Sequence, residues 1–295
     1  MTRALLQNTP RRALLRQLGS AIGLAALGTP ALAPAQPQEK VYNFSPVNQA
    51  SIPLMVGYWS PIIAYVSERS GVKLVLKLGR TSADTTSYVL AQEVDFVFSN
   101  HLFSPEREQL GWRVFARRQT PPIHGQIIVP ADSPITELSQ LEGKDVAFPG
   151  PEALVSYKFT YAQLLSRKIN VRVVFGGNTD GALAQLYSGK VAACGVNSQL
   201  AENHARREGK AYRVLWSSEA LHELALMASA RVPDKDMQAV AHAFVNMHKD
   251  PRGLAILEQA SQVIGLSGAA HFVASDGSEY GAYRRFYLSA PPQLR

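Results

Sequence analysis

Short strand-like segments alternate with helical segments along almost the whole chain after residue 40. Apolar runs rich in valine and phenylalanine predict strands, and intervening stretches with 3.6-residue periodicity predict helices. Strands are expected at 41–47, 72–78, 94–99, 112–116, 126–129, 143–148, 171–175, 191–196, 214–216 and 225–228, and helices at 53–69, 82–92, 151–168, 179–188, 234–248 and 251–262. This alternation predicts an α/β fold, because strands separated by helices pair most readily in sheets covered by those helices.

Two parts of this pattern resemble each other. The turn Gly79-Arg80-Thr81-Ser82 and the turn Gly176-Gly177-Asn178-Thr179 each follow a strand, precede a helix of about ten residues and lead to a short apolar strand. Open α/β sheets bind ligands beyond the carboxyl ends of their strands, beside helix N-termini. The repetition therefore predicts two lobes whose polar turns face a shared crevice.

The charge of the chain argues against a nucleic-acid partner. The formal net charge is +7, but the first 35 residues hold four arginines and no acid. The other 260 residues therefore carry 26 basic and 23 acidic side chains, a net charge of +3. A nucleic-acid-binding surface needs a dense basic face, which this balance does not provide.

Residues 1–35 are expected to be an export signal. Thr9-Pro10-Arg11-Arg12 and the mild apolar run behind it resemble a twin-arginine signal, and Ala33-Pro34-Ala35 predicts cleavage near Ala35. The alternative is a disordered or amphipathic N-terminal helix. The mature chain is then expected in the periplasm, where its single Cys194 has no internal disulfide partner and is expected to be buried.

Several motifs resemble those of a known family. They are Tyr58-Trp59-Ser60-Pro61, Gln92-Glu93-Val94-Asp95-Phe96, the segment 131–144 with its Asp-Ser-Pro start and Gly-Lys end, Gly189-Lys190-Val191-Ala192-Ala193, and Asp250-Pro251-Arg252-Gly253. Their order is similar to that in the periplasmic solute-binding proteins of phosphate, phosphite and phosphonate ABC transporters.

The resemblance implies a type II periplasmic binding protein, in which two lobes with mixed sheets flanked by helices are joined by a two-stranded hinge. Lobe 1 is expected at 36–124 and 226–295 and lobe 2 at 125–225, with the crossings near 124–126 and 224–228. Such a protein captures a small polar or anionic ligand by hinge closure and delivers it to a transporter permease. A sensor-kinase ectodomain is the alternative receiver, and the protein is expected to be a monomer without a cofactor.

Polar residues at the strand ends are the candidate ligand contacts. They are Asn48, Tyr58, Thr81, Ser82, Ser99, Asn100, His101, Gly150, Ser156, Tyr157, Asn178 and Asn197. Hydroxyl, amide and backbone N–H donors near helix starts suit a small anion. For several of them a structural role is the alternative: Thr81 and Asn178 can cap helices, Gly150 can form a tight turn, and Tyr58 can pack in the core.

The sequence departs from typical phosphonate binders after Gly150-Pro151. Those proteins carry Ser-Thr-Ser-Gly at this helix start, whereas this chain has Glu152-Ala153-Leu154-Val155. A carboxylate facing a phosphonate is costly unless it is paired. We therefore expect a different small polar molecule or oxyanion, with Ser156 and Tyr157 providing the contacts from lobe 2.

Catalysis is the main alternative to binding. The sequence contains no Gly-x-Ser-x-Gly, His-Glu-x-x-His or Cys-x-x-Cys motif, and its seven histidines are scattered. His242 and His248 are six residues apart, too far to share one helix face. We therefore expect neither an enzyme nor a metal site, and an exported two-lobed enzyme remains the alternative.

Overall fold

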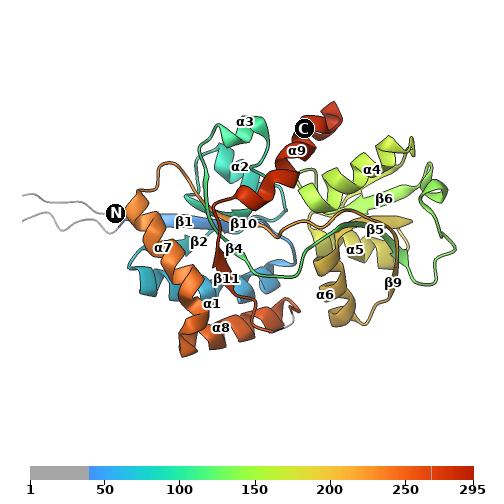
Figure 1. Ribbon diagram of the computed structural model, residues 1–295. Helices are drawn as coiled ribbons and strands as arrows, with labels where there is room; N and C mark the ends of the chain where they lie inside the picture. Colours follow the sequence, from blue (N-terminus) through green and yellow to red (C-terminus); the bar gives the residue numbers. More distant parts are fainter. Residues whose placement is uncertain (1–39, 267) are drawn as a thin grey trace, which may run out of the picture. The chain divides into compact units, whose positions relative to one another are not determined.

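The computed structural model describes residues 40–266 and 268–295, which form one compact unit (Figure 1). The expected export signal and its cleavage site lie outside these residues. Two separate sheets organise the unit, with helices packed against both. We call the part built on the first sheet lobe 1 and the part built on the second sheet lobe 2. The predicted pair of mixed sheets flanked by helices is confirmed.

Lobe 1 contains a six-stranded sheet in the order β11-β4-β10-β3-β1-β2. Its strands are β1 (Val41–Pro46), β2 (Lys73–Leu76), β3 (Phe96–Ser99), β4 (Arg113–Arg118), β10 (Ala225–Ala228) and β11 (Phe272–Ala274). Its helices are α1 (Ile52–Ser70), α2 (Asp84–Leu90), α3 (Pro105–Glu108), α7 (Asp234–Asn246), α8 (Pro251–Val263) and α9 (Gly281–Ser289). Because β1 pairs in parallel with both β2 and β3, the carboxyl ends of these three strands meet at one edge.

Lobe 2 contains a five-stranded sheet in the order β7-β6-β8-β5-β9. Its strands are β5 (Gly125–Pro130), β6 (Asp145–Phe148), β7 (Arg172–Phe175), β8 (Ala193–Asn197) and β9 (Tyr212–Ser217), and its helices are α4 (Thr160–Ser166), α5 (Thr179–Tyr187) and α6 (Ser198–Glu208). The three strands β6, β7 and β8 run parallel, so lobe 2 also gathers their carboxyl ends at one edge.

Two crossing segments join the lobes, one between β4 and β5 and the other between β9 and β10. They pair with each other at Ile123 and Leu221, whose backbone amides donate to each other's carbonyls over 2.9 and 2.8 Å. Because β10 begins at Ala225 within the sheet of lobe 1, the expected boundary after residue 225 falls one residue inside that strand.

The expected helix at 151–168 begins differently from the prediction. Residues 151 and 152 form a turn, and a π-helix (Leu154–Phe159) precedes α4. Two sheet glycines allow this wide turn to lie directly on the strands: a Cβ on Gly125 would be 2.6 Å from the Val155 carbonyl oxygen, and one on Gly195 would be 2.5 Å from that of Ser156. Glycine within strands marks such close backbone approaches.

Four of the labelled helices and strands were not expected from the sequence: the short α3, α6, α9 and β11. The buried face of α6 consists of Ala201, Asn203 and His204, so it carries little apolar periodicity. Helix α9 is short and places Tyr283 and Tyr287 on its buried side. These elements are stabilised by tertiary contacts that a local pattern does not contain.

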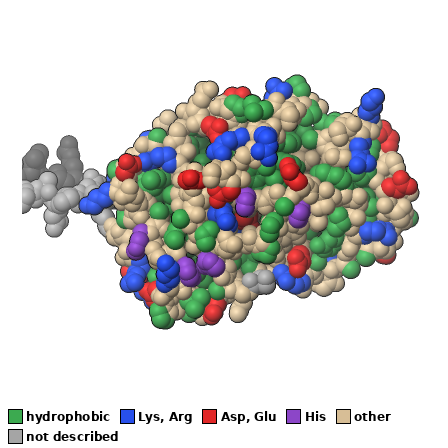
Figure 2. Space-filling model, viewed as in Figure 1, with side chains coloured by type: hydrophobic (Ala, Val, Ile, Leu, Met, Phe, Trp, Pro, Cys, Tyr) green, Lys and Arg blue, Asp and Glu red, His purple; other side chains and the backbone are tan. Residues whose placement is uncertain are grey.

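The buried apolar residues form separate clusters within the lobes and one cluster that includes residues of both. The joint cluster contains Leu154 and Val155 of lobe 2 together with Tyr280, Tyr283 and Tyr287 of lobe 1. Cys194 is buried and free, as expected, and burial raises the pKa of its thiol. Among the helices in the described part of the chain, none is long and apolar enough to cross a bilayer. Figure 2 shows acidic and basic side chains interspersed on the visible face.

Candidate functional site

A small cavity lies where the carboxyl ends of the two sheets meet. Its volume is about 30 Å³, enough for roughly two water molecules. Both lobes line it: Val47, Asn48, Gln49, Ser82, Asn100, His101 and Leu224 come from lobe 1, and Pro149, Ala153, Leu154, Val155, Ser156, Thr179, Asn197 and Leu200 come from lobe 2. The lining contains amides, hydroxyls and one imidazole but no Lys, Arg, Asp or Glu side chain.

Six of the twelve predicted contact residues line this cavity: Asn48, Ser82, Asn100, His101, Ser156 and Asn197. Four others are adjacent to it. Ser99 accepts a hydrogen bond from the His101 amide over 3.0 Å, and Gly150 approaches Ser82 so closely that a Cβ there would be 2.6 Å from the Ser82 hydroxyl. Thr81 donates to Asp84 over 2.9 Å, and Asn178 caps α5 by accepting from the Gly181 amide over 2.9 Å.

The remaining two predicted residues pack inside the lobes. Tyr58 is 1% exposed in the core of lobe 1, where its ring contacts Trp59 edge to face. Tyr157 stacks on Tyr161 and meets Phe148 edge to face in lobe 2. Neither ring lines the cavity: Tyr58 lies in the core of lobe 1, and the partly buried Tyr157 packs against the apolar cluster of lobe 2.

Asn48 follows β1 and is completely buried. Its amide nitrogen donates to the carbonyls of Gly79 and Arg80, over 3.0 and 3.3 Å. These two acceptors fix the orientation of the amide, because only the nitrogen end can face them. Among the residues that the structure describes, the oxygen Oδ1 has no hydrogen-bond partner.

Ser82 lies at the start of α2 and is 3% exposed. Its backbone N–H donates to the Gly177 carbonyl of lobe 2 over 2.8 Å, which joins the two turns that resemble each other in sequence. Its hydroxyl finds no hydrogen-bond partner in the described segments 40–266 and 268–295. Two buried polar atoms of the lining thus lack a partner, and each such atom costs about 1–3 kcal/mol of stability.

His101 is the titratable residue of the lining. It is 2% exposed, and its Nδ1 lies 3.0 Å from the Thr86 hydroxyl. Burial lowers the pKa of His101 to about 3, because the charged imidazolium is poorly solvated there. The ring is therefore neutral at physiological pH, and the cavity contains hydrogen-bonding groups without a cationic side chain.

Two helices of lobe 2 begin at the cavity. Thr179 is the first residue of α5, and Asn197 caps α6 by accepting from the amides of Gln199 and Leu200 over 2.9 and 3.4 Å. The N-terminal ends of helices carry partial positive charge. The N-terminal ends of α5 and α6 therefore give the uncharged lining a positive electrostatic potential, which favours an anion.

One ion pair bridges the lobes beside the cavity. Arg107 of lobe 1 pairs with Glu152 of lobe 2, and the two side chains are 20% and 21% exposed. Arg107 is held in place by the His101 carbonyl, to which it donates over 2.8 Å. Burial disfavours the charged form of Glu152, but the hydrogen bond from Arg107 and the positive charges of neighbouring basic side chains together outweigh it and lower the pKa of the Glu152 carboxyl. The carboxylate is therefore paired and lies outside the lining.

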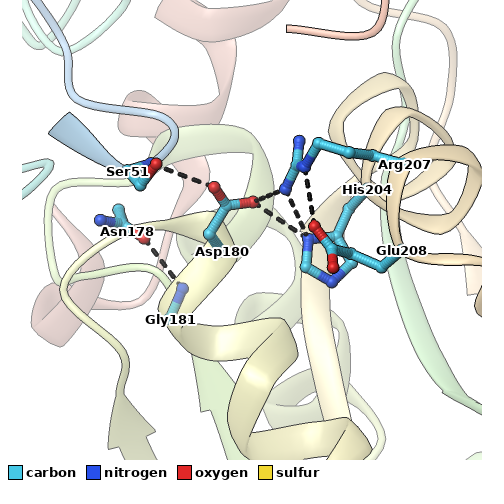
Figure 3. A network of polar contacts seen from close by, with 7 residues as sticks. All are labelled: Ser51, Asn178, Asp180, Gly181, His204, Arg207 and Glu208. Atoms are coloured by element: carbon cyan, nitrogen blue, oxygen red, sulfur yellow. Dashed lines mark hydrogen bonds and ion pairs between the residues drawn. The ribbon is translucent and has the colours of Figure 1, made fainter. Parts of the chain in front are cut away.

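A second carboxylate bridges the lobes through the network in Figure 3. Asp180, on the first turn of α5, accepts from the Ser51 backbone amide of lobe 1 over 3.0 Å. Its other oxygen lies 2.7 Å from Arg207 Nη2 and 3.0 Å from His204 Nδ1, both on α6. Burial opposes ionisation of Asp180, but the hydrogen bonds from His204 and Arg207 lower the pKa of its carboxyl.

Sequence reasoning missed these two bridges and the apolar part of the lining. Arg107 and Glu152 are 45 residues apart, and Ser51 and Asp180 are 129 apart, so no local pattern pairs them. Leu154, Val155 and Leu200 look like ordinary core residues in the sequence. Thr179 lies in the predicted polar turn at 176–179. Its position at the start of a helix is the sequence signal that could have identified it as a lining residue.

The described residues contain no cluster of three or more His, Cys, Asp or Glu side chains that could hold a metal ion. The arrangement can surround a small polar guest with neutral donors and acceptors. It can also couple that guest to the contact between the lobes, because the cavity, the Arg107–Glu152 pair and the Asp180–Ser51 bond all require both lobes.

Comparison with known proteins agrees with this architecture. A family model described as "ABC transporter, phosphonate, periplasmic substrate-binding protein" matches residues 44–280. None of the curated proteins compared matches the chain. Among solved structures, a binding-protein component of an ABC phosphonate transporter from Pseudomonas aeruginosa is 16% identical, with a TM-score of 0.72 over 85% of this chain and 86% of that one.

Two further structures share the fold. A Prochlorococcus marinus protein in complex with methylphosphonate is 14% identical, with a TM-score of 0.70 over 84% of this chain and 97% of that one. A Xanthomonas citri protein solved with ATP is 15% identical, with a TM-score of 0.64 over 84% and 96%. At these identities the likeness shows the fold, and the predicted type II two-lobed architecture is confirmed.

Proposed function

Because the chain belongs to the periplasmic substrate-binding proteins of phosphonate ABC transporters, we propose that it captures a small phosphorus oxyanion between its two lobes. Solute capture for an ABC transporter is the function of this family. The proposal concerns the ligand: a compact tetrahedral anion such as methylphosphonate, phosphite or phosphate.

The observation that carries the proposal is a pair of unpartnered polar atoms on two residues of the cavity lining. The Ser82 hydroxyl and Asn48 Oδ1 are buried at its lining without a partner among the described residues. A polar ligand that hydrogen-bonds both atoms removes their desolvation cost. An apolar ligand would leave both atoms unpaired.

The position of Glu152 supports a phosphorus oxyanion, contrary to our expectation from the sequence. That expectation assumed an unpaired carboxylate facing the ligand. In the structure Glu152 is paired with Arg107 and lies outside the lining. The Arg107–Glu152 ion pair has no net charge. The repulsion between the Glu152 carboxylate and a phosphonate is therefore largely removed. The Prochlorococcus marinus neighbour, solved with methylphosphonate, supports the same ligand class.

We propose further that residues 1–35 direct export through the twin-arginine route, with cleavage near Ala35, and that the mature chain acts as a monomer. The Arg11-Arg12 pair and the small residues before position 36 support the export step. The closed lobes then present their joint outer surface to the permease. Opening at the two crossing segments releases the ligand.

Isothermal titration of the mature protein tests the ligand class. We expect saturable binding of methylphosphonate, phosphite or phosphate, with a rise in the melting temperature that grows with ligand concentration. Ser82→Ala removes one donor and should weaken binding roughly tenfold, as loss of a hydrogen bond to a charged group does. Absence of binding by all three anions would exclude the proposal.

A further inference from the structure

The buried amide of Asn48, a residue of the cavity lining, leaves an acceptor and not a donor without a partner among the described residues. Both hydrogens of its Nδ2 are directed to lobe 1 carbonyls, those of Gly79 and Arg80. Turning the amide over would place Oδ1 against two carbonyl oxygens, which repel it. The orientation is therefore fixed, and Oδ1 remains without a donor in the part of the chain that the structure describes.

A fully ionised oxyanion cannot satisfy this atom, because all its oxygens are acceptors. Bringing one of them to a buried carbonyl-type oxygen adds repulsion to the desolvation cost that both atoms already carry. An oxyanion that keeps one proton has an O–H group, which can donate to Oδ1 while its other oxygens accept. The cavity contains no cationic side chain that would favour a fully ionised form instead.

We propose that Asn48 is a specificity-determining residue that selects the protonated form of the oxyanion by accepting a hydrogen bond from its P–OH group. This inference rests on the proposed function and names the protonation state that the same site requires. Buried groups left unpaired by the wrong ligand are an effective means of discrimination, because the penalty falls only on that ligand.

The lining also indicates which ligand group carries the donor. An ammonium on an aminoalkyl chain could donate to Oδ1, but the lining contains no Asp or Glu side chain that would neutralise its charge. The compact phosphorus anions of the proposed function carry no ammonium. The proton therefore belongs to an oxygen of the compact anion.

The Ser82 hydroxyl provides a matched control on the same cavity. A hydroxyl can donate to any oxyanion oxygen, whether or not the ligand is protonated. Loss of Ser82 should therefore weaken protonated and unprotonated ligands alike, and loss of the Asn48 acceptor should change their ratio. The two variants separate affinity from selectivity.

The experiment compares pairs of ligands that match in shape and charge and differ by one proton. Methylphosphonate monoanion is matched by methanesulfonate, and hydrogen phosphate is matched by sulfate. Titration calorimetry of the mature wild-type protein should give dissociation constants lower for each phosphorus ligand than for its sulfur partner, by roughly tenfold to hundredfold. Asn48→Leu should reduce this ratio towards one, and Ser82→Ala should weaken both ligands and leave the ratio unchanged.

The outcomes distinguish this inference from the proposed function. If none of the phosphorus anions binds, the proposed function fails. If methylphosphonate and methanesulfonate bind equally well, or Asn48→Leu keeps the full ratio, the function stands and the role of Asn48 is overturned. Tighter binding of 2-aminoethylphosphonate than of methylphosphonate would also overturn it, because the donor would then be an ammonium. Should Asn48→Leu fail to fold, equal binding of each phosphorus ligand and its sulfur partner by the wild type still overturns the inference.

Discussion

Arg118 and Glu223 form a completely buried ion pair at the hinge, 2.9 Å apart and each 1% exposed. Arg118 is the last residue of β4, where one crossing segment leaves lobe 1, and Glu223 lies just before β10, where the other returns. Although burial disfavours its charge, Tyr58 and Glu223 keep the pKa of Arg118 above its usual value. The Glu223 carbonyl also accepts from the Tyr280 hydroxyl over 2.8 Å. The two crossings are thus tied to each other and to the C-terminal part of lobe 1.

Glu223→Gln should destabilise the protein severely, because it leaves the Arg118 guanidinium buried without its counter-charge. Breaking one partner of a buried pair costs about 3–5 kcal/mol. Denaturant unfolding should show a large fall in midpoint. The matched control is Arg172→Gln, which removes the exposed Arg172–Asp145 pair of lobe 2. This variant should hardly change the unfolding midpoint. An unchanged midpoint in Glu223→Gln would show that the hinge does not depend on this charge.

Asp180→Ala should weaken ligand binding by roughly tenfold, because it removes a charged acceptor that bonds lobe 2 to the Ser51 amide of lobe 1. Glu208→Gln is the control, since Glu208 contacts Arg207 in the same network but is not bonded to lobe 1. Calorimetry gives the affinity, and small-angle scattering gives the compactness without and with ligand. Equal affinities in the two variants would contradict a role for Asp180 in closure.

Arg107→Met should reduce anion affinity for two reasons: the bridge to lobe 2 is lost, and the Glu152 carboxylate is left unpaired beside the cavity. We expect a loss of roughly tenfold or more. Adding Glu152→Gln to this variant should restore part of the affinity, because it removes the repulsive charge. A double variant that binds no better than Arg107→Met would show that the Glu152 charge does not reach the ligand.

His101 predicts a specific dependence of stability on pH. Its pKa is lowered from 6.5 to about 3 in the folded state, so the unfolded chain binds a proton between these values and the folded chain does not. The stabilisation from the neutral ring is complete above pH 6.5 and is lost as the pH falls towards 3. The slope from this group is at most about 1.4 kcal/mol per pH unit.

The measurement is the free energy of unfolding of the wild type and of His101→Gln across this pH window. In the variant, the free energy of unfolding should depend less steeply on pH. The dependence that remains below pH 4.5 comes from carboxyls with lowered pKa, such as Glu152 and Asp180. These carboxylates stabilise the fold above their unfolded pKa values, and their contribution disappears in acid. Identical pH profiles would show that His101 is solvated in the protein in solution.

Much of the architecture could be predicted from local sequence. The apolar strands, the polar turns after them and the Asp250-Pro251 break are visible because periodicity and proline act over a few residues. The same reasoning identified the turns that supply Asn48, Ser82, His101 and Asn197 to the cavity. The structure places Tyr58 and Tyr157 outside the cavity lining, which local sequence could not reveal, since an aromatic residue in a strand-helix unit looks the same whether it meets a ligand or packs in the protein.

Local sequence patterns are sufficient to predict the α/β units, the polar turns at the carboxyl ends of strands and the likeness between the turns at 79–82 and 176–179. The three-dimensional fold was needed to show that these two turns bond directly, Ser82 to Gly177, and that Glu152 is neutralised by Arg107. It also decided that the acceptor end of Asn48 is the one without a partner. The physical reason is range: helix and strand preferences arise from near neighbours in the chain, whereas pairing and burial depend on which distant segments the fold brings together.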